Sequence, residues 1–411
     1  MNGEFHSLSI SLRVCVKIPS QKRPLASRTS DVLILGAGVT GASLAFRLAE
    51  RGMSVTVIDA GEDVGAGSTP RATGGYRAQF SSEINIRLSL FSRHMLLRFA
   101  EETGVDPEYR QCGYLFLAET EEQLAGLTAA VELQKKCGVE GVQIVRMEEI
   151  AAINPHIALN GVVGGSFGST DGFIRPLKIL EGFILASRRQ GVRFIWGEKV
   201  TGFRTNGEWV KEVITGKHEY AAGSVVNCAG AWAGKVSGLA GADVPIRPLK
   251  RQVAATMPTD IIPPDLPLSI FLGNGFHFRE RDGRVLLLLT VDPEAKDAFD
   301  TRVEHSWVQR VRTEADRWVP KLRGTQIDRE ACWAGLYEMT PDHHAIAGRV
   351  PGFENFYILG GSSGHGVMHS PALGLLMAEL ISEGKFRTLD VSALDPGRFA
   401  AGKEIGGVHL I

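Results

Sequence analysis

The sequence predicts an α/β fold in which one domain, made from both ends of the chain, is interleaved with a second domain built on an antiparallel sheet. Two strand–glycine turn–helix units, near residues 31–51 and 356–383, predict the first domain. Between them, apolar runs at 252–256, 275–279 and 284–290 and an amphipathic run at 304–318 predict a sheet with a covering helix. One shared domain explains the two distant glycine turns better than two separate domains do.

The first unit has the pattern of a dinucleotide-binding turn. Gly36, Gly38 and Gly41 form G-x-G-x-x-G between a strand that starts at Asp31 and a helix over 42–51. The first glycine permits the tight turn, the second lets a pyrophosphate approach the backbone, and the third lets the helix pack on the strand. A second strand, 54–58, ends at Asp59, whose carboxylate can accept hydrogen bonds from ribose hydroxyls. An acid here argues against NADP; a turn with a purely structural role is the alternative.

Length, charge and cysteine content limit the class of protein. A chain of 411 residues has room for two domains, and its formal charge of −1 favours neither nucleic acid nor an anionic membrane as a partner. Five cysteines without C-x-x-C spacing indicate a reducing, cytoplasmic setting. No run of eighteen apolar residues predicts a membrane span. Peripheral contact with a membrane stays open.

Residues 1–30 differ from the rest of the chain. They carry five Lys or Arg and one acid, Glu4, and apolar residues alternate with polar ones from Leu8 to Ile18. Alternation predicts a strand rather than the amphipathic helix of a transit peptide. An extension without a catalytic role is favoured, while an appended edge strand, an upstream start codon and a targeting segment stay open.

The remaining pattern gives a coarse order of elements. A Gly/Ser/Thr-rich loop spans 61–75, and the charged pair Lys250-Arg251 is expected on the surface. Helices are expected at 83–104, 121–138, 177–190 and 370–383, and strands at 112–118, 192–196, 200–205, 210–215 and 224–228.

Five segments together resemble a known family. They are Gly36–Gly41, Gly67–Gly75, Val225–Gly230, Thr340–Asp342 and Gly361–Gly366. In this order and spacing they resemble the D-amino-acid-oxidase-type FAD-dependent amine oxidoreductases, which include sarcosine oxidase, glycine oxidase, dimethylglycine dehydrogenase and the β subunit of L-proline dehydrogenases. The stretch 333–344 is most similar to the sarcosine and proline dehydrogenase branch. The resemblance spans residues 31–383.

The resemblance implies a Rossmann-like FAD-binding domain of the GR2 type and a substrate domain over the flavin. It assigns 31–82, 155–240 and 330–390 to the FAD-binding domain, 83–154 and 241–329 to the substrate domain, and 391–411 to a C-terminal tail. Val200 is implied to meet the adenine through its backbone. The residues implied to bind FAD are Gly36, Ala37, Gly38, Val39, Thr40, Gly41, Asp59, Ala60, Ser68, Thr69, Thr73, Gly74, Gly75, Val200, Ala229, Gly230, Gly361, Gly364, His365, Gly366 and Val367.

Four departures from the family pattern bear on activity. Gly335 stands where some sarcosine oxidases have a flavin-linking cysteine, and Pro176 where others have a flavin-linking histidine, so non-covalent FAD is expected. Met368 replaces a lysine that binds substrate carboxylate in some members. The lysine that assists oxygen reduction has no counterpart in 286–289. The loss of both lysines argues against a simple sarcosine oxidase, and the loss of the second favours a dehydrogenase over an oxidase.

Four residues are candidates for the chemistry, each with a structural alternative. By the family resemblance, Arg77 falls near an arginine that binds the substrate carboxylate, and Arg71 is the less favoured choice. An arginine that faces the surface or a phosphate is the alternative. His365 is expected over the flavin, His277 on a strand facing it, and Tyr337 near the substrate. For His365 the alternative is that only its backbone matters, in the turn. For His277 the alternative is packing within the sheet, and for Tyr337 it is packing in the core.

These expectations converge on FAD-dependent oxidation of a small amino acid or secondary amine, of the proline, sarcosine or glycine type. Hydride transfer to flavin N5 gives an imine, and the turn at Gly364–Gly366 can stabilise negative charge on the reduced flavin. The electron acceptor is expected to be a quinone, a partner subunit or O2, and a hetero-oligomer stays open. A non-catalytic flavoprotein subunit, an opine-type oxidase subunit and an NAD-dependent dehydrogenase are the alternatives. No metal is expected, because His343 and His344 are adjacent and lack further ligands.

Overall fold

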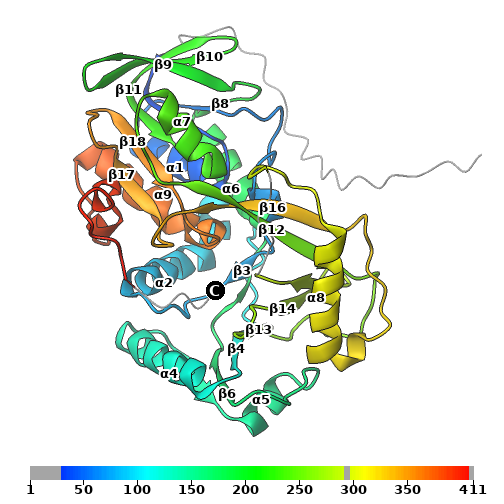
Figure 1. Cartoon of the computed structure of the whole chain (residues 1–411). Coiled ribbons are helices and arrows are strands. Elements are labelled where there is room, and N and C mark those ends of the chain that lie inside the picture. The colour runs from blue at the N-terminus through cyan, green and yellow to red at the C-terminus, as the bar shows by residue number, and fades with distance from the viewer. Residues whose placement is uncertain (1–28, 291–296, 407–411) are drawn as a thin grey trace, which may run out of the picture.

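A computed structural model describes residues 29–290 and 297–406 (Figure 1). Within these residues the strands form two eight-stranded sheets and one two-stranded sheet. The predicted strand at 8–18 lies outside the described residues.

The first sheet joins the two ends of the chain. Its order is β17-β18-β11-β1-β2-β8, and the β9–β10 hairpin extends from β11. β1 pairs in parallel with β2 and β11, and β11 pairs in parallel with β18. Its strands are β1 (Thr29–Leu35), β2 (Val55–Ile58), β8 (Arg193–Ile195), β9 (Val200–Asn206), β10 (Trp209–Thr215), β11 (Glu219–Asn227), β17 (Ile346–Arg349) and β18 (Phe356–Gly360).

The second sheet has the order β16-β12-β15-β14-β13-β4-β6-β5 and is mainly antiparallel, with β13 and β4 parallel. Its strands are β4 (Tyr114–Ala118), β5 (Val142–Val145), β6 (Gly164–Gly168), β12 (Arg247–Ala255), β13 (Leu268–Phe271), β14 (His277–Arg281), β15 (Arg284–Leu288) and β16 (Trp333–Met339). The small sheet pairs β3 (Gly75–Tyr76) with β7 (Gly172–Phe173). The α/β class and the second sheet are confirmed.

The division of the chain into interleaved domains stays a prediction. The structure adds that β6 and β16, which lie inside segments assigned to the FAD-binding domain, pair with the second sheet. Figure 1 shows the helices around the two sheets. They are α1 (Val39–Ala49), α2 (Glu83–Leu97), α3 (Phe99–Thr103), α4 (Glu121–Lys136), α5 (Met147–Ile153), α6 (Pro176–Arg189), α7 (Ala233–Leu239), α8 (His305–Trp318) and α9 (Gly366–Glu383).

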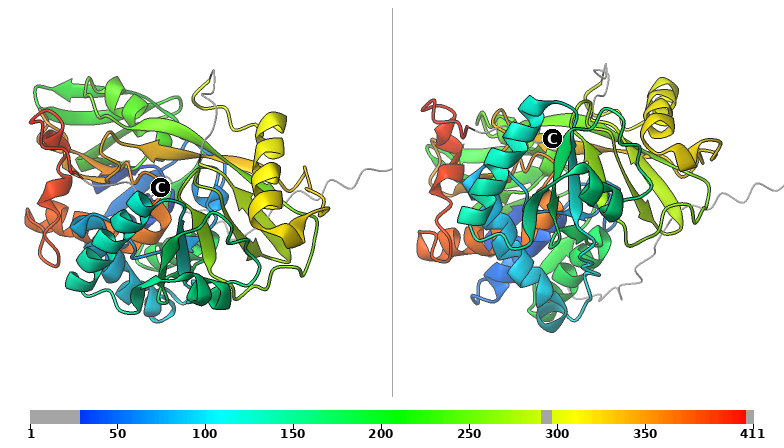
Figure 2. Two further views of the ribbon diagram at one scale, coloured as in Figure 1. Left: turned by 60° about the horizontal axis from the view of Figure 1, so that its bottom comes forward. Right: turned by 90° about the horizontal axis from the view of Figure 1, so that it is seen from below.

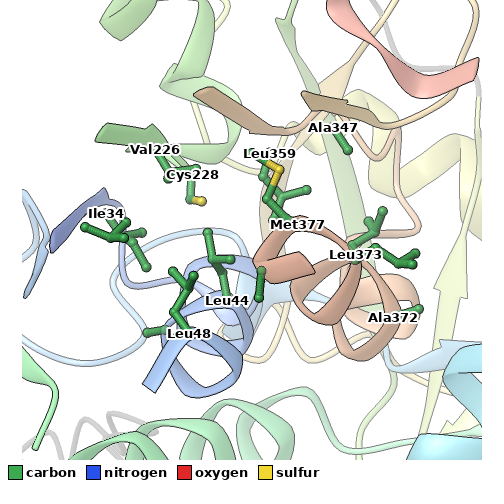
Figure 3. Packing of buried hydrophobic residues seen from close by; sticks show 14 of the residues in the cluster. Ile34, Leu44, Leu48, Val226, Cys228, Ala347, Leu359, Ala372, Leu373 and Met377 are labelled. Atoms are coloured by element: carbon green, nitrogen blue, oxygen red, sulfur yellow. The ribbon is translucent and has the colours of Figure 1, made fainter. Parts of the chain in front are cut away.

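The first and last helices pack together against the first sheet. Leu44 and Leu48 of α1 and Leu373 and Met377 of α9 are buried in one cluster beneath the strands (Figure 3). Gly374 permits this close approach, because a Cβ there would lie 2.2 Å from the hydroxyl of Ser43. The core therefore ties the N-terminal βαβ unit to the C-terminal strand–helix unit.

The second sheet is covered by α8 on one of its faces. Trp307, Val311 and Trp318 of α8 pack on the face that carries Phe278 and Leu287. The α8 helix, drawn in yellow, lies along one side of the sheet in Figure 2. Since side chains alternate along a strand, His277 and Arg279 on β14 point to the opposite face. That face is directed away from α8.

Several helix boundaries differ from the prediction. The single helix expected at 83–104 is broken at Arg98, where φ is −105° and ψ is 5°. α9 begins at Gly366 rather than near Ser370 and contains Pro371. The Ser370 hydroxyl donates to the Val367 carbonyl at 2.9 Å, which satisfies the acceptor that proline leaves without an amide donor.

Two further features were not expected from the sequence. β6 is a glycine-rich strand, and a Cβ at Gly165 would lie 2.3 Å from the Phe116 carbonyl oxygen, so the close pairing with β4 requires glycine. Lys250 was expected on the surface, but it is buried on β12 and forms an ion pair with Glu304. The surface prediction for Lys250 is therefore wrong, because the pairing carboxylate comes from a distant segment.

Candidate functional site

The turn between β1 and α1 has the geometry of a pyrophosphate cradle. Gly36 has φ +114°, and a Cβ there would lie 2.4 Å from the Cys228 carbonyl oxygen. A Cβ at Gly41 would lie 2.0 Å from the Gly36 carbonyl oxygen. At Gly38, by contrast, the nearest atom is the Thr69 hydroxyl at 3.6 Å, and this N-cap glycine has no side chain of its own to cap α1. Amides of the first turn of α1 other than that of Val39, which donates to the Thr69 hydroxyl at 3.2 Å, are therefore available to an anion.

Asp59 is positioned at the end of β2 by backbone amides. Its carboxylate accepts from the amides of Ala37 at 2.6 Å and Gly61 at 2.7 Å, and lone pairs remain for ribose hydroxyls. The amide of Glu198 donates to the Asp59 carbonyl at 2.8 Å, which brings the segment before Val200 beside this acid. The predicted adenosine-binding residues therefore lie close together.

The loop before β3 bridges the cradle and the second sheet. The Thr69 hydroxyl accepts from the Val39 amide at 3.2 Å, at the start of α1. The Ser68 hydroxyl donates to the Leu336 carbonyl at 2.8 Å, on β16. Arg71 donates to the Gly67 carbonyl at 2.7 Å, within its own loop, so it contributes to loop structure. The loop thus holds β16 near the N-terminus of α1.

The turn before α9 forms the other side of the site. Gly361, Ser363 and Gly364 all have positive φ, and a Cβ at Gly364 would lie 2.5 Å from the Tyr337 ring. The carboxylate of Glu338 accepts from the Ser362 amide at 3.1 Å. Burial raises the pKa of Glu338. No motif in the sequence marks Glu338 as a site residue, although it stands directly after the candidate Tyr337.

Arg77 and His365 meet at the centre of the site. Arg77 is buried, donates to the Gln79 carbonyl at 2.8 Å, and places Nη2 3.1 Å from Nε2 of His365. Its guanidinium carbon lies 4.2 Å from the centre of the Phe80 ring. Burial lowers the pKa of Arg77, and Tyr114, Asp171 and Tyr337 oppose that shift. Arg77 remains charged at neutral pH.

The two histidines of the site are neutral. Burial lowers the pKa of His365 well below its usual value, and the charge of Arg77 lowers it further. Burial lowers the pKa of His277 to about 4, and Nδ1 of His277 lies 2.8 Å from the Gly275 carbonyl oxygen. The charge of Arg77 also acts on His277. The structure therefore brings all four candidates, Arg77, His365, His277 and Tyr337, to one region.

A buried polar network holds the backbone and side chains of Ala78 and Gln79, the two residues that follow Arg77. Asp171 accepts from the Ala78 amide at 2.7 Å and from the Gln79 side chain at 2.9 Å. Ser166 donates to the same Gln79 side chain at 2.8 Å. Burial raises the pKa of Asp171 to about 6. The sequence gives no sign of this network, because its members come from two segments, 77–79 and 166–171, that are far apart in the chain.

The His343-His344 segment has a structural role. Nε2 of His344 lies 2.8 Å from the Ser82 hydroxyl oxygen, and Nδ1 of His344 lies 2.5 Å from the Asp342 carbonyl oxygen. The Asp342 carboxylate accepts from two nitrogens of Arg398, at 2.8 and 3.0 Å, and from the His344 amide at 3.2 Å. These bonds assign Asp342 to fixing the turn after Pro341.

Comparison with known proteins agrees with this geometry. The family model for DAO, FAD dependent oxidoreductase, matches residues 31–380. The chain belongs to this family. In the DAO family the cofactor is FAD, so the expected cofactor and the oxidoreductase class are confirmed.

Relatives in the DAO family span most of the chain. The FAD-dependent oxidoreductase domain-containing protein 1 of Xenopus laevis is 30% identical over 424 residues, covering 91% of this chain and 83% of that protein. The crystal structure of L-proline dehydrogenase from P. horikoshii matches with a TM-score of 0.85 and 31% identity, covering 92% of this chain and 99% of that chain. Glycine oxidase from Geobacillus kaustophilus matches with a TM-score of 0.79 and 26% identity, covering 90% and 99%.

The helices of the described residues give no sign of a membrane span. No helix within residues 29–290 and 297–406 is both long enough and apolar enough to cross a bilayer.

Proposed function

We propose that this DAO-family protein oxidises a small amino acid or secondary amine, of the proline, sarcosine or glycine type, to an imine. The observation that carries the proposal is the buried guanidinium of Arg77, which forms no salt bridge within the described residues. A buried charge is stabilised only when it is paired, so Arg77 is suited to a substrate carboxylate. The planar fork can bind that carboxylate through two parallel hydrogen bonds.

The residues around the glycine turns fit FAD. The first turn of α1 would hold the pyrophosphate, Asp59 the ribose, and the loop from Ser68 to Gly75 the flavin side of the cofactor. Gly335 and Pro176 offer no atom for a covalent link, so FAD is proposed to bind non-covalently. FAD supplies the acceptor for a hydride when it is bound.

The protein's part in this chemistry is to bind and orient. The substrate loses a hydride from its α-carbon and a proton from its nitrogen, two electrons in all, and water hydrolyses the imine. Arg77 would fix the carboxylate, which restricts the direction in which the α-hydrogen points. His365 and His277 are neutral, so they add no positive charge beside Arg77. The amides at the N-terminus of α9 would stabilise negative charge that develops on the cofactor.

A dehydrogenase is favoured over an oxidase. Leu286 and Leu288 lie on the same face of the sheet as Arg279 and His277, their partners on β14, and neither offers the cation that assists oxygen reduction. Electrons would pass to a quinone or a partner subunit in a hetero-oligomer, with O2 the poorer acceptor. A cytoplasmic protein, with peripheral membrane contact open, fits such acceptors.

The test is an anaerobic visible spectrum of the purified holoprotein before and after proline, sarcosine, glycine and a D-amino acid in turn. Bleaching of the flavin by one of them supports the proposal and identifies the substrate type, and Arg77→Gln should abolish that bleaching while retaining bound FAD. Acid precipitation should release the flavin into the supernatant. A yellow protein that none of these substrates bleaches favours a non-catalytic subunit or an opine-type substrate instead.

A further inference from the structure

A second arginine is buried on the site-facing side of the second sheet. Arg279 on β14 is 4% exposed and lies on the same face as His277. It donates from Nη1 to the Thr73 carbonyl at 3.0 Å and from Nε to the Glu280 carbonyl at 3.0 Å. Its guanidinium carbon lies 3.4 Å from the centre of the Phe173 ring. Arg279 is thus held beside the loop that is proposed to line the flavin.

No carboxylate of the described residues forms a salt bridge with Arg279. Four arginines are buried in residues 29–290 and 297–406. Arg47 pairs with Glu102 at 2.5 Å, and Arg398 pairs with Asp342 at 2.8 Å. Arg77 and Arg279, both at the site, form no salt bridge with any described residue. The fold therefore pairs Arg47 and Arg398 with carboxylates away from the site and leaves Arg77 and Arg279 without a salt bridge within the described residues.

Both guanidinium groups lie beside one group of aromatic rings, Phe116, Tyr114 and Phe173, which we call the aromatic floor. Arg77 lies 5.4 Å from the Phe116 ring, and Arg279 lies against Phe173. Tyr114 lies between these two rings, 6.4 Å from Phe116 and 6.3 Å from Phe173 by ring centroids. A Cβ at Gly75 would lie 1.8 Å from the Tyr114 hydroxyl, so this floor reaches the loop before Arg77. Both arginine charges act on the Tyr114 phenol.

We propose that the substrate is an amino dicarboxylate, with its α-carboxylate on Arg77 and a second carboxylate on Arg279. This inference rests on the proposed function, since it adds a second anchor to the same oxidation. The second carboxylate belongs either to the side chain of an acidic amino acid or to a carboxyalkyl group on the amine nitrogen. Either one supplies the anion that a buried guanidinium requires.

The first test measures binding without turnover. The holoprotein is titrated with propionate and with the dicarboxylates succinate and glutarate, and the flavin absorbance and the Tm report binding. At least one dicarboxylate should bind about ten times more tightly than propionate, the effect of one added charge-assisted hydrogen-bonded pair. Flavin bleaching by glutamate, aspartate and iminodiacetate then distinguishes a side-chain carboxylate from one on the nitrogen substituent.

Variants assign the effect to Arg279. Arg279→Gln should remove the preference for dicarboxylates and leave propionate binding unchanged, and Arg77→Gln should weaken both. Arg281→Gln is the matched control, because Arg281 lies two residues away on the same strand and Asp282 is 3.8 Å from it. It should change neither affinity. Arg279→Lys, which keeps the charge, should retain part of the preference.

The outcomes separate the two proposals. Equal affinity for mono- and dicarboxylates, with proline or sarcosine still bleaching the flavin, overturns the dicarboxylate inference alone. Loss of flavin content in Arg279→Gln without any change of ligand preference assigns Arg279 to the cofactor and also overturns it. Absence of any response to carboxylates and amino acids, in the wild type and in Arg77→Gln, overturns the proposed function itself.

Discussion

Nη2 of Arg77 lies 3.1 Å from Nε2 of His365, although 288 residues separate them in sequence. A guanidinium has only donors, so Nε2 of His365 must accept this hydrogen bond and the ring proton resides on Nδ1. A neutral histidine therefore orients Arg77 without competing for the same anion.

This contact predicts a positioning role for His365. In His365→Ala, the Arg77 side chain loses a hydrogen-bond acceptor and gains conformational freedom. KM for the substrate should therefore rise about tenfold, which corresponds to the free energy of a hydrogen bond to a charged group. The value of kcat should change less. Because His365 is already neutral, the pH profile of kcat/KM between pH 6 and 8 should keep its shape. A large fall in kcat with unchanged KM would contradict this role.

The stability of the protein should depend on pH through His369, one turn further along α9. His369 is buried with Nε2 2.9 Å from the Ser89 hydroxyl, and burial lowers its pKa to about 3. Below pH 6.5 the unfolded chain gains a proton at this histidine and the folded chain does not. The free energy of unfolding should thus fall on acidification by up to about 1.4 kcal/mol per pH unit from this group.

Asp171 acts in the opposite direction, because its pKa is raised to about 6 and the folded protein takes up that proton first. The comparison of wild type with His369→Gln isolates the histidine contribution. Urea unfolding between pH 5 and 7.5 should give a flatter profile for the variant below pH 6.5. Parallel profiles would show that His369 does not contribute.

Substitution by alanine should have different effects on stability at two glycines of the first turn. Gly38→Ala meets no protein atom closer than 3.6 Å and its φ of −67° suits alanine, so the apoprotein should keep its stability and lose FAD affinity. Gly41→Ala places Cβ 2.0 Å from the Gly36 carbonyl oxygen, so it should destabilise the fold by several kcal/mol, about the cost of overpacking. Urea unfolding of the apoprotein measures the loss of stability, and FAD titration measures the loss of affinity. Equal losses of stability in Gly38→Ala and Gly41→Ala would count against a pyrophosphate cradle at Gly38.

The ion pair of Asp342 and Arg398 should anchor the C-terminal segment. Their side chains are 2% and 4% exposed, and Arg398 also donates to the His344 carbonyl at 3.1 Å. Arg398→Met leaves a buried carboxylate unpaired and should cost about 3–5 kcal/mol in urea unfolding. The double variant Asp342→Asn/Arg398→Met should recover part of that loss. Additive losses in the double variant would show that the two residues are not coupled.

Much of the FAD-binding half is recognisable from the sequence, because its signals are local. The spacing of Gly36, Gly38 and Gly41 follows from steric demands within a single turn, and the strands and helices around it show clear periodicity. Arg77 and His365 are each marked by neighbouring glycines. The helix break at Arg98 and the glycine-rich strand β6 leave no such signal, because they depend on what packs against them.

The sequence by itself determined the dinucleotide-binding turn, the α/β class and the candidates Arg77, His365, His277 and Tyr337. Only the tertiary structure decided that His365 accepts from Arg77, that Glu338 and Asp171 lie at the site, and that Arg279 is buried without a salt bridge to any described residue. The physical reason is the range of the interactions. A turn is fixed by sterics over a few residues, whereas burial and charge pairing depend on partners contributed by distant strands.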